Sequence, residues 1–211
     1  MRLIHTSLFA AIAALGLTAC NKPADTTPEA TPAAEATAAQ PTAESTPDAP
    51  PAMTSEAHAN HGAAAELAPT KDSTVKGNVT FSMVDGKVHV KGAVSGLKPN
   101  SEHGFHIHEK GDCSAPDGAS AGGHFNPGKE DHGSVAATPH HGGDMPNIKA
   151  DAQGNAVVDA DVSTNVNIGK GDDFDIIGRG LIVHADADDY KTQPTGNAGA
   201  RLACAVIKAA P

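Results

Sequence analysis

The sequence has no tryptophan, one tyrosine and five phenylalanines among its 211 residues. A core with so few aromatic side chains has to be built from valine, isoleucine, leucine and alanine. β-Branched side chains fit the pleated surface of a sheet. The composition therefore favours a β-rich fold.

The sequence also lacks a membrane-length apolar run at its start. The run from Leu8 to Leu17 follows Arg2 and is too short to span a bilayer as a finished helix, which is typical of a signal-peptide core. Residues 17–20, Leu-Thr-Ala-Cys, resemble a bacterial lipobox, in which Cys20 is acylated and becomes the first residue of the mature chain. We therefore expect residues 1–20 to be a lipoprotein-type signal peptide. An ordinary cleaved signal followed by an unrelated cysteine is the alternative, and both interpretations take the rest of the chain out of the cytoplasm.

Residues 21–62 contain no aromatic residue and are rich in alanine, proline, threonine and glutamate. Such a segment cannot bury enough surface to offset its conformational entropy, so the composition predicts a disordered tether. Its six acidic residues against Lys22 alone keep it solvated and extended. Met53, His58 and His61 could form a loose metal-acquisition site, although histidines in a polar linker are more often simply solvated.

Residues 63–211 suffice for a single domain with one core. They contain 13 lysines and arginines against 19 aspartates and glutamates, a net charge of −6. An acidic, mixed surface of this kind argues against nucleic acid as a partner.

Histidine is plentiful, and two of the 12 histidines lie in the apolar run 104–108. If this run is a β-strand, His106 and His108 point to the same face and can converge on one metal ion. A strand that happens to carry two histidines is the alternative for this pair alone. Further candidate ligands follow along the chain: His124, His132, His141, Asp144 and His184. This number exceeds the needs of one first-row metal ion and suits two adjacent sites.

The strand signals are short and separated by turns. Residues 75–83 and 87–94 alternate apolar and polar side chains around Asp85-Gly86, which predicts a hairpin with His89 on its exposed face. Further strand character occurs at 156–162, 174–184 and 201–207. Short strands without a helical period favour an all-β fold, an antiparallel barrel or sandwich.

Residues 110–150 are rich in glycine, proline, aspartate, histidine and serine and have hardly any apolar pattern. A structureless stretch of this length in a compact domain is normally a functional loop. Four candidate ligands lie within it, so metal would supply the order that a core cannot. A second stretch rich in aspartate and glycine follows His184.

Five motifs resemble the copper-zinc superoxide dismutases of the bacterial, secreted type. They are HGFHIHEKGDC (103–113), GGHFNP (122–127), HGGDMP (141–146), GRGLIVHADADD (178–189) and GNAGARLAC (196–204). They occur in the family's order, and the resemblance extends from about Ala64 to the end. It implies a Greek-key antiparallel β-barrel or sandwich of about eight strands with two long functional loops.

The resemblance also implies the ligands of both metals. Copper is assigned to His106, His108, His124 and His184. Zinc is assigned to His124, His132, His141 and Asp144. Imidazoles alone tolerate both oxidation states of copper, whereas an added carboxylate suits redox-silent, tetrahedral zinc. His124 belongs to both sets because imidazole has two nitrogens, and His140 is the alternative to its neighbour His141.

Two further roles come from the family. Asp188 matches the carboxylate that orients one copper histidine, His106, and one zinc histidine, His132. Arg201 matches the arginine that positions the anion beside copper. His103, on the opposite pleat from His106, is expected to hold backbone and not metal.

Three cysteines leave one unpaired in an exported protein unless Cys20 carries lipid. Cys113 and Cys204 then remain as a natural disulfide pair. This bridge would tether the loop that begins at Cys113 to the last strand.

The implied reaction is dismutation of superoxide to dioxygen and hydrogen peroxide, by a protein held in the periplasm or cell envelope through the lipid on Cys20 only. A non-enzymatic copper carrier on the same fold would lack copper ligands or Arg201, and a copper-only relative would lack His132, His141 and Asp144. A periplasmic metal buffer would bind metal without turnover. The sequence leaves open whether the domain is a monomer or a homodimer.

Overall fold

The computed structural model describes residues 62–211. The expected signal peptide, the lipid on Cys20 and residues 21–61 of the expected tether lie outside the described residues. Within 62–211, no helix is long and apolar enough to cross a membrane.

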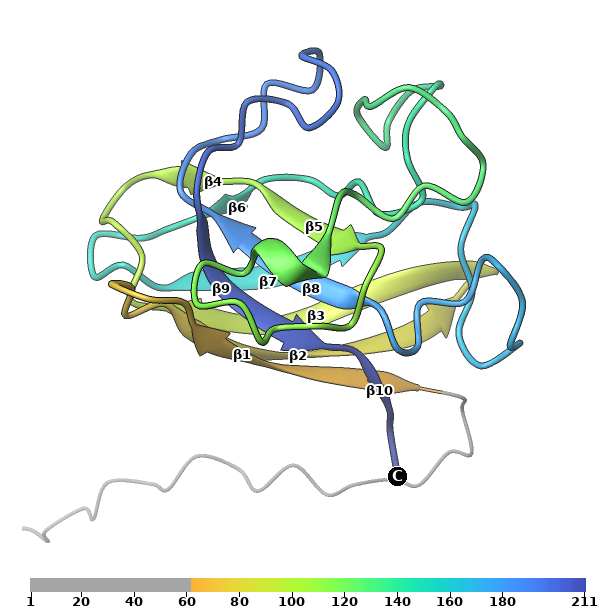
Figure 1. Cartoon of the computed structure of the whole chain (residues 1–211), viewed down its shortest axis with the longest axis horizontal. Helices are drawn as coiled ribbons and strands as arrows, with labels where there is room; N and C mark the ends of the chain where they lie inside the picture. The colour runs from red at the N-terminus through yellow and green to blue at the C-terminus, as the bar shows by residue number, and fades with distance from the viewer. Residues whose placement is uncertain (1–61) are drawn as a thin grey trace, which may run out of the picture. The chain divides into compact units, whose positions relative to one another are not determined.

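Ten strands and one 3-10 turn make up the regular structure of the described residues. The strands are β1 (Ala63–Pro69), β2 (Lys76–Val84), β3 (Lys87–Ser95), β4 (Glu102–His103), β5 (Phe105–His108), β6 (Ile148–Lys149), β7 (Ala156–Asp161), β8 (Gly180–His184), β9 (Arg201–Val206) and β10 (Lys208–Ala209), and the turn is η1 (Ala119–Ala121). Eight strands form one curled sheet in the order β5-β8-β9-β1-β2-β3-β7, with β10 on β1, while β4 pairs with β6 (Figure 1). All pairs are antiparallel, which confirms the prediction of an all-β Greek-key barrel.

The predicted hairpin is formed by β2 and β3, which pair from Lys76↔Ser95 to Val84↔Lys87. Its turn places Asp85 and Gly86 at φ 49° and 79°, the left-handed region that aspartate and glycine tolerate. The core is mainly aliphatic, as the composition predicts, and includes three buried phenylalanines: Phe81, Phe105 and Phe125.

β8 begins later than the apolar pattern of 174–184 suggests, at Gly180. The carboxylate of Asp175 accepts backbone N–H groups at 2.8–3.0 Å from Gly169, Gly171 and Ile177. These bonds fold the segment into a turn before the strand can start. A side chain that satisfies nearby backbone donors competes in this way with strand pairing.

Two long loops carry residues of the expected site, and the later part of one extends from the same side of the barrel as the other (Figure 1). The β5–β6 loop (109–147) contains η1. The β8–β9 loop (185–200) joins β8 to β9. The loops contact each other, because Asn147 Nδ2 donates to the Asp188 carbonyl at 2.9 Å. Both expected functional loops are therefore present, and they meet beside the histidine-bearing end of β5.

Candidate metal centre

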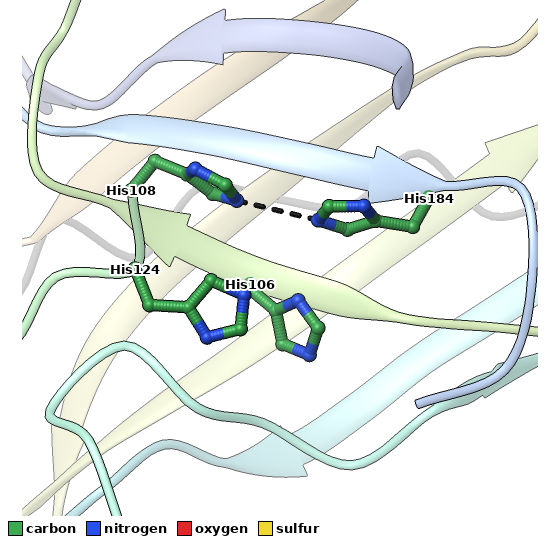
Figure 2. Close-up of side chains that lie close together, drawn as sticks. All are labelled: His106, His108, His124 and His184. Carbon is green, nitrogen blue, oxygen red and sulfur yellow. Dashed lines mark hydrogen bonds between the residues drawn. The ribbon is translucent and has the colours of Figure 1, made fainter. Parts of the chain in front are cut away.

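The alternation of β5 separates core from site. Phe105 and Ile107 belong to the hydrophobic core, while His106 and His108 face the other way and are 0% and 1% exposed. β8 pairs directly with β5 and ends at His184. His124 lies shortly after η1, and its backbone forms an isolated antiparallel β-bridge with that of His108. Figure 2 shows these four imidazoles turned toward one another.

We call His106, His108, His124 and His184 the all-histidine group. One nitrogen from each ring lies within 4.8 Å of the others, and Nε2 of His108 is 3.3 Å from Nε2 of His184. Two more nitrogens, His106 Nδ1 and His124 Nε2, are buried and have no hydrogen-bond partner among the described residues. Buried polar atoms are normally satisfied, so these unpaired nitrogens fit a metal ion that the group would hold.

Burial keeps the imidazoles of His108, His124 and His184 neutral. It lowers the pKa of His124 to about 4 and that of His184 to about 3. The pKa of His108 is also held well below 6.5, first by burial and then by His124 and His184. Neutral imidazoles offer the lone pairs that a transition metal requires.

We call His124, His132, His141 and Asp144 the mixed group. Asp144 Oδ1 lies 2.8, 3.0 and 3.4 Å from the Nδ1 atoms of His124, His132 and His141. The Nδ1 atoms of His124 and His141 are 3.4 Å apart. An ion held tetrahedrally at 2.0–2.1 Å keeps its ligand atoms about 3.3–3.4 Å apart. The two 3.4 Å separations match this value, whereas the contacts of Asp144 with His124 and His132 are shorter. Three imidazoles and one carboxylate are a donor set that fits zinc.

Asp144 is completely buried and anchored by backbone. Its Oδ2 accepts the N–H groups of His141 at 2.8 Å and Gly133 at 3.1 Å. Burial alone raises the pKa of this carboxyl, but hydrogen bonds from the three histidines of the mixed group outweigh burial and hold it well below its usual range. The carboxylate is therefore ionised at all ordinary pH values.

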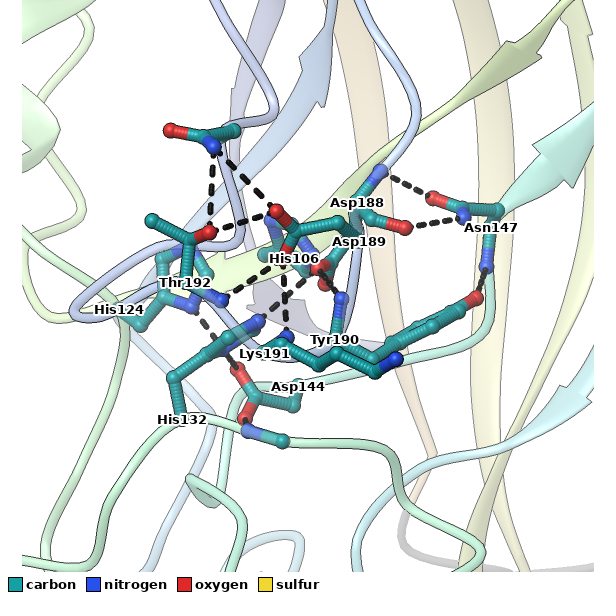
Figure 3. A network of polar contacts seen from close by, with 12 residues as sticks. His106, His124, His132, Asp144, Asn147, Asp188, Asp189, Tyr190, Lys191 and Thr192 are labelled. Atoms are coloured by element: carbon teal, nitrogen blue, oxygen red, sulfur yellow. Dashed lines mark hydrogen bonds and ion pairs between the residues drawn. The ribbon is translucent and has the colours of Figure 1, made fainter.

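Asp188 connects the two groups (Figure 3). Its carboxylate oxygens lie 2.9 Å from His106 Nε2 and 2.9 Å from His132 Nε2. Burial raises the pKa of Asp188, but these two contacts outweigh it and lower the pKa far below 3.8. For His132 the directions are reversed. Burial lowers the pKa of this imidazole, but Asp144 and Asp188 together raise it to about 9.

Arg201 lies opposite His184 in the β8–β9 pairing. Its guanidinium donates to the carbonyls of Gly118 and Gly122, each at 2.6 Å. The Gly122 carbonyl also contacts His108 Nδ1 at 2.9 Å. The guanidinium is thus fixed next to the all-histidine group.

The Cys113–Cys204 disulfide is present and confirms the expected pair. It joins the β5–β6 loop to β9 across a sequence separation of 91 residues. The loop that contains His124 is therefore tied to the strand that contains Arg201.

Two other buried histidines lie outside both groups. His140 bonds the Ala137 carbonyl and Ser163 Oγ, so His141 and not His140 faces the mixed group. His103 Nδ1 donates to the His184 carbonyl at 2.8 Å, which is the backbone-holding role expected for it. His89 lies on the outer face as expected, but its ring is held between Asp159 and Asp161.

Two further side chains, not predicted from the sequence, hold the loops. Asn147 exchanges hydrogen bonds of 2.9 Å with the backbone of Asp188. Gln193 bonds both backbone polar groups of His132. No local pattern marks these residues, because their partners lie 41 and 61 positions away.

Comparisons with known proteins agree with this geometry. A family model described as copper/zinc superoxide dismutase (SODC) matches residues 75–207. "Superoxide dismutase [Cu-Zn] 2" of Aquifex aeolicus is 41% identical over 149 residues, which are 69% of this chain and 86% of that protein. "Superoxide dismutase-like protein YojM" of Bacillus subtilis is 40% identical over 123 residues, 57% of this chain and 61% of that protein. Among solved structures, the clock protein EA4 has a TM-score of 0.63 and 39% identity, covering 74% of this chain and 99% of its own.

Proposed function

The chain belongs to the copper/zinc superoxide dismutase family, and from that membership we propose how its own residues divide the dismutation of superoxide between two metal sites. The all-histidine group would hold copper and the mixed group would hold zinc. The observation that carries this division is His124, whose Nδ1 faces Asp144 at 2.8 Å while its buried Nε2 has no partner among the described residues. One ring can therefore bridge two cations.

Copper, when bound, supplies the redox chemistry by taking an electron from one superoxide anion and passing it to a second. The second anion also needs two protons to leave as hydrogen peroxide, one of which solvent water can supply. With Nδ1 in the mixed group, Nε2 is the atom of His124 that can take up a proton and deliver it. Asp188 meanwhile holds the rings of His106 and His132 in place, as partners of ligand nitrogens do.

Arg201 positions the anion. Two of its N–H groups are occupied by backbone carbonyls, and the remaining donors of the guanidinium can bind superoxide. A non-enzymatic carrier is not favoured, because every copper ligand and the arginine are in place.

We extend the proposal to the whole chain: residues 1–20 act as a lipoprotein signal peptide, Cys20 carries the lipid, residues 21–62 are a tether and residues 63–211 are the catalytic domain. The protein would then work in the periplasm or cell envelope. The Cys113–Cys204 disulfide supports an oxidising compartment.

The test is superoxide turnover by the purified full chain, measured together with its copper and zinc content. We expect about one copper and one zinc per chain and rapid turnover, which disappears when copper is removed. Two bound metals without turnover would favour the carrier, and turnover without zinc would contradict the mixed group.

A further inference from the structure

His132 lies in the β5–β6 loop, outside any strand, so its backbone needs partners from elsewhere. Both come from one side chain. The His132 N–H donates to Gln193 Oε1 at 2.9 Å, and Gln193 Nε2 donates to the His132 carbonyl at 2.9 Å. The amide of Gln193 thus pairs with this residue as a neighbouring strand would.

The segment around Gln193 is itself well braced. Asp189 accepts the N–H groups of Lys191 and Thr192 at 2.9 and 2.8 Å, and Gly196 N donates to the Thr192 carbonyl at 2.7 Å. Gln193 therefore extends from a fixed turn, which reduces the entropy lost when its amide binds.

The same loop reaches His132 from a second direction. Asp188 contacts His132 Nε2, and the backbone at Gly196 packs so closely that a Cβ there would collide with the Asp188 carboxylate and the His132 ring. Gly196 also has φ of +65°. Glycine is therefore favoured at this position both by the lack of space for a Cβ and by the backbone conformation. His132 is consequently held at its ring and at its backbone by the β8–β9 loop.

We propose that Gln193 is a positioning residue for the zinc site: its amide fixes the backbone of His132 so that Nδ1 of the ring faces Asp144. The proposal rests on the assignment of zinc to the mixed group. It makes zinc retention depend on the β8–β9 loop, although that loop contributes no zinc ligand. A ligand whose backbone is fixed in advance loses less freedom on binding metal.

The experiment compares zinc release from the zinc-loaded full chain to an excess of chelator. Gln193→Met keeps the length of the side chain and removes both hydrogen bonds. We expect release about 3–10-fold faster, somewhat below the usual cost of removing a partner that bonds a ligand ring directly. Gln153→Met is the matched control, because Gln153 lies exposed in a distant turn and bonds only through its backbone N–H, while its side-chain amide makes no hydrogen bond among the described residues.

Amide hydrogen exchange at His132 gives the local readout. The Gln193→Met variant should lose protection of this N–H, while Gln193→Glu, which keeps an acceptor oxygen, should retain it. The urea midpoint of the metal-free chain should stay close to the value of the control, because Gln193 is exposed and is not part of the hydrophobic core.

If the Gln193→Met variant released zinc at the wild-type rate, the proposal would be overturned and the zinc assignment would remain intact. Unchanged exchange at His132 in that variant would overturn it as well, since the two bonds would then not exist. A wild-type chain that bound no zinc would overturn both the positioning role and the function it rests on.

Discussion

The role proposed for Arg201, attraction of an anion, has to work against the net charge of the domain. The described domain carries a net charge of −6, so an anion has to be attracted by a local positive field. Arg201→Glu should retain both metals and lose turnover by about tenfold or more, the range over which electrostatic steering acts, and Arg201→Ala should fall in between. The measurement is superoxide turnover at matched metal content.

Ionic strength provides the control for this prediction. Added salt should slow the wild type, because it screens attraction, and should not slow the Glu variant, in which it screens repulsion. If Arg201→Glu turned over superoxide at the wild-type rate, Lys170 and Lys191 would be the next residues to test.

Single residues could be singled out from the sequence where histidines and aspartates lie in recognisable motifs. The structure brings the four side chains of each group together, with Asp188 in contact with His106 and His132. Gln193 and Asn147 were missed, because an amide that bonds backbone in a distant loop leaves no local signature. Their roles exist only after the two loops have come together.

At the scale of elements, β7 is an edge strand held to β3 by charges as well as by backbone. His89 on β3 contacts Asp161 at 2.7 Å and Asp159 at 2.8 Å. The hydrogen bond to Asp161, with help from Asp159 and against a smaller effect of burial, raises the pKa of His89 above 6.5. A raised pKa in the folded state means that this contribution is complete below pH 6.5 and disappears as pH rises through the folded value.

The pH prediction follows from that sign. Urea unfolding of the wild type and of His89→Gln should differ more at pH 6 than at pH 8. Comparing the two proteins at each pH cancels the titration of the metal ligands, which both share. A difference in unfolding free energy that did not change with pH would contradict the role of the protonated imidazole.

The disulfide is the second element-scale constraint. It closes a loop of 91 residues, which corresponds to about 4–5 kcal/mol in the chain-entropy model. Cys113→Ser/Cys204→Ser should therefore unfold at a lower temperature and lose metal more readily, because the freed loop contains His124. Calorimetry and metal analysis check this, and unchanged melting and zinc content would contradict it.

The elements themselves were partly predictable. The β2–β3 hairpin follows from alternation around Asp85-Gly86, a signal that is entirely local. β8 was predicted too long because Asp175 bonds three backbone N–H groups and ends the extended pattern early. The two-residue strands β4 and β6 have no periodicity to detect, since pairing with each other alone defines them.

For the whole molecule, the proposed division is between an N-terminal part attached to the membrane and a separate catalytic domain. Cys20→Ser should release the protein from membranes without changing its specific activity, because the proposed lipid site and the proposed metal sites lie in different segments. Lipoprotein processing normally adds several acyl chains, and stable attachment takes more than one. Membrane fractionation with activity measurement tests this, and a variant that stayed with the membrane would contradict the lipoprotein assignment.

The most direct test of the whole account is the metal content of two single variants, His124→Ala and His108→Ala, beside the wild type. If one imidazole serves both sites, His124→Ala should lose zinc as well as copper, while His108→Ala should lose chiefly copper and keep its zinc. The wild type should hold about one of each. A His124→Ala protein that lost copper alone and kept full zinc would show that the two groups do not share this ring.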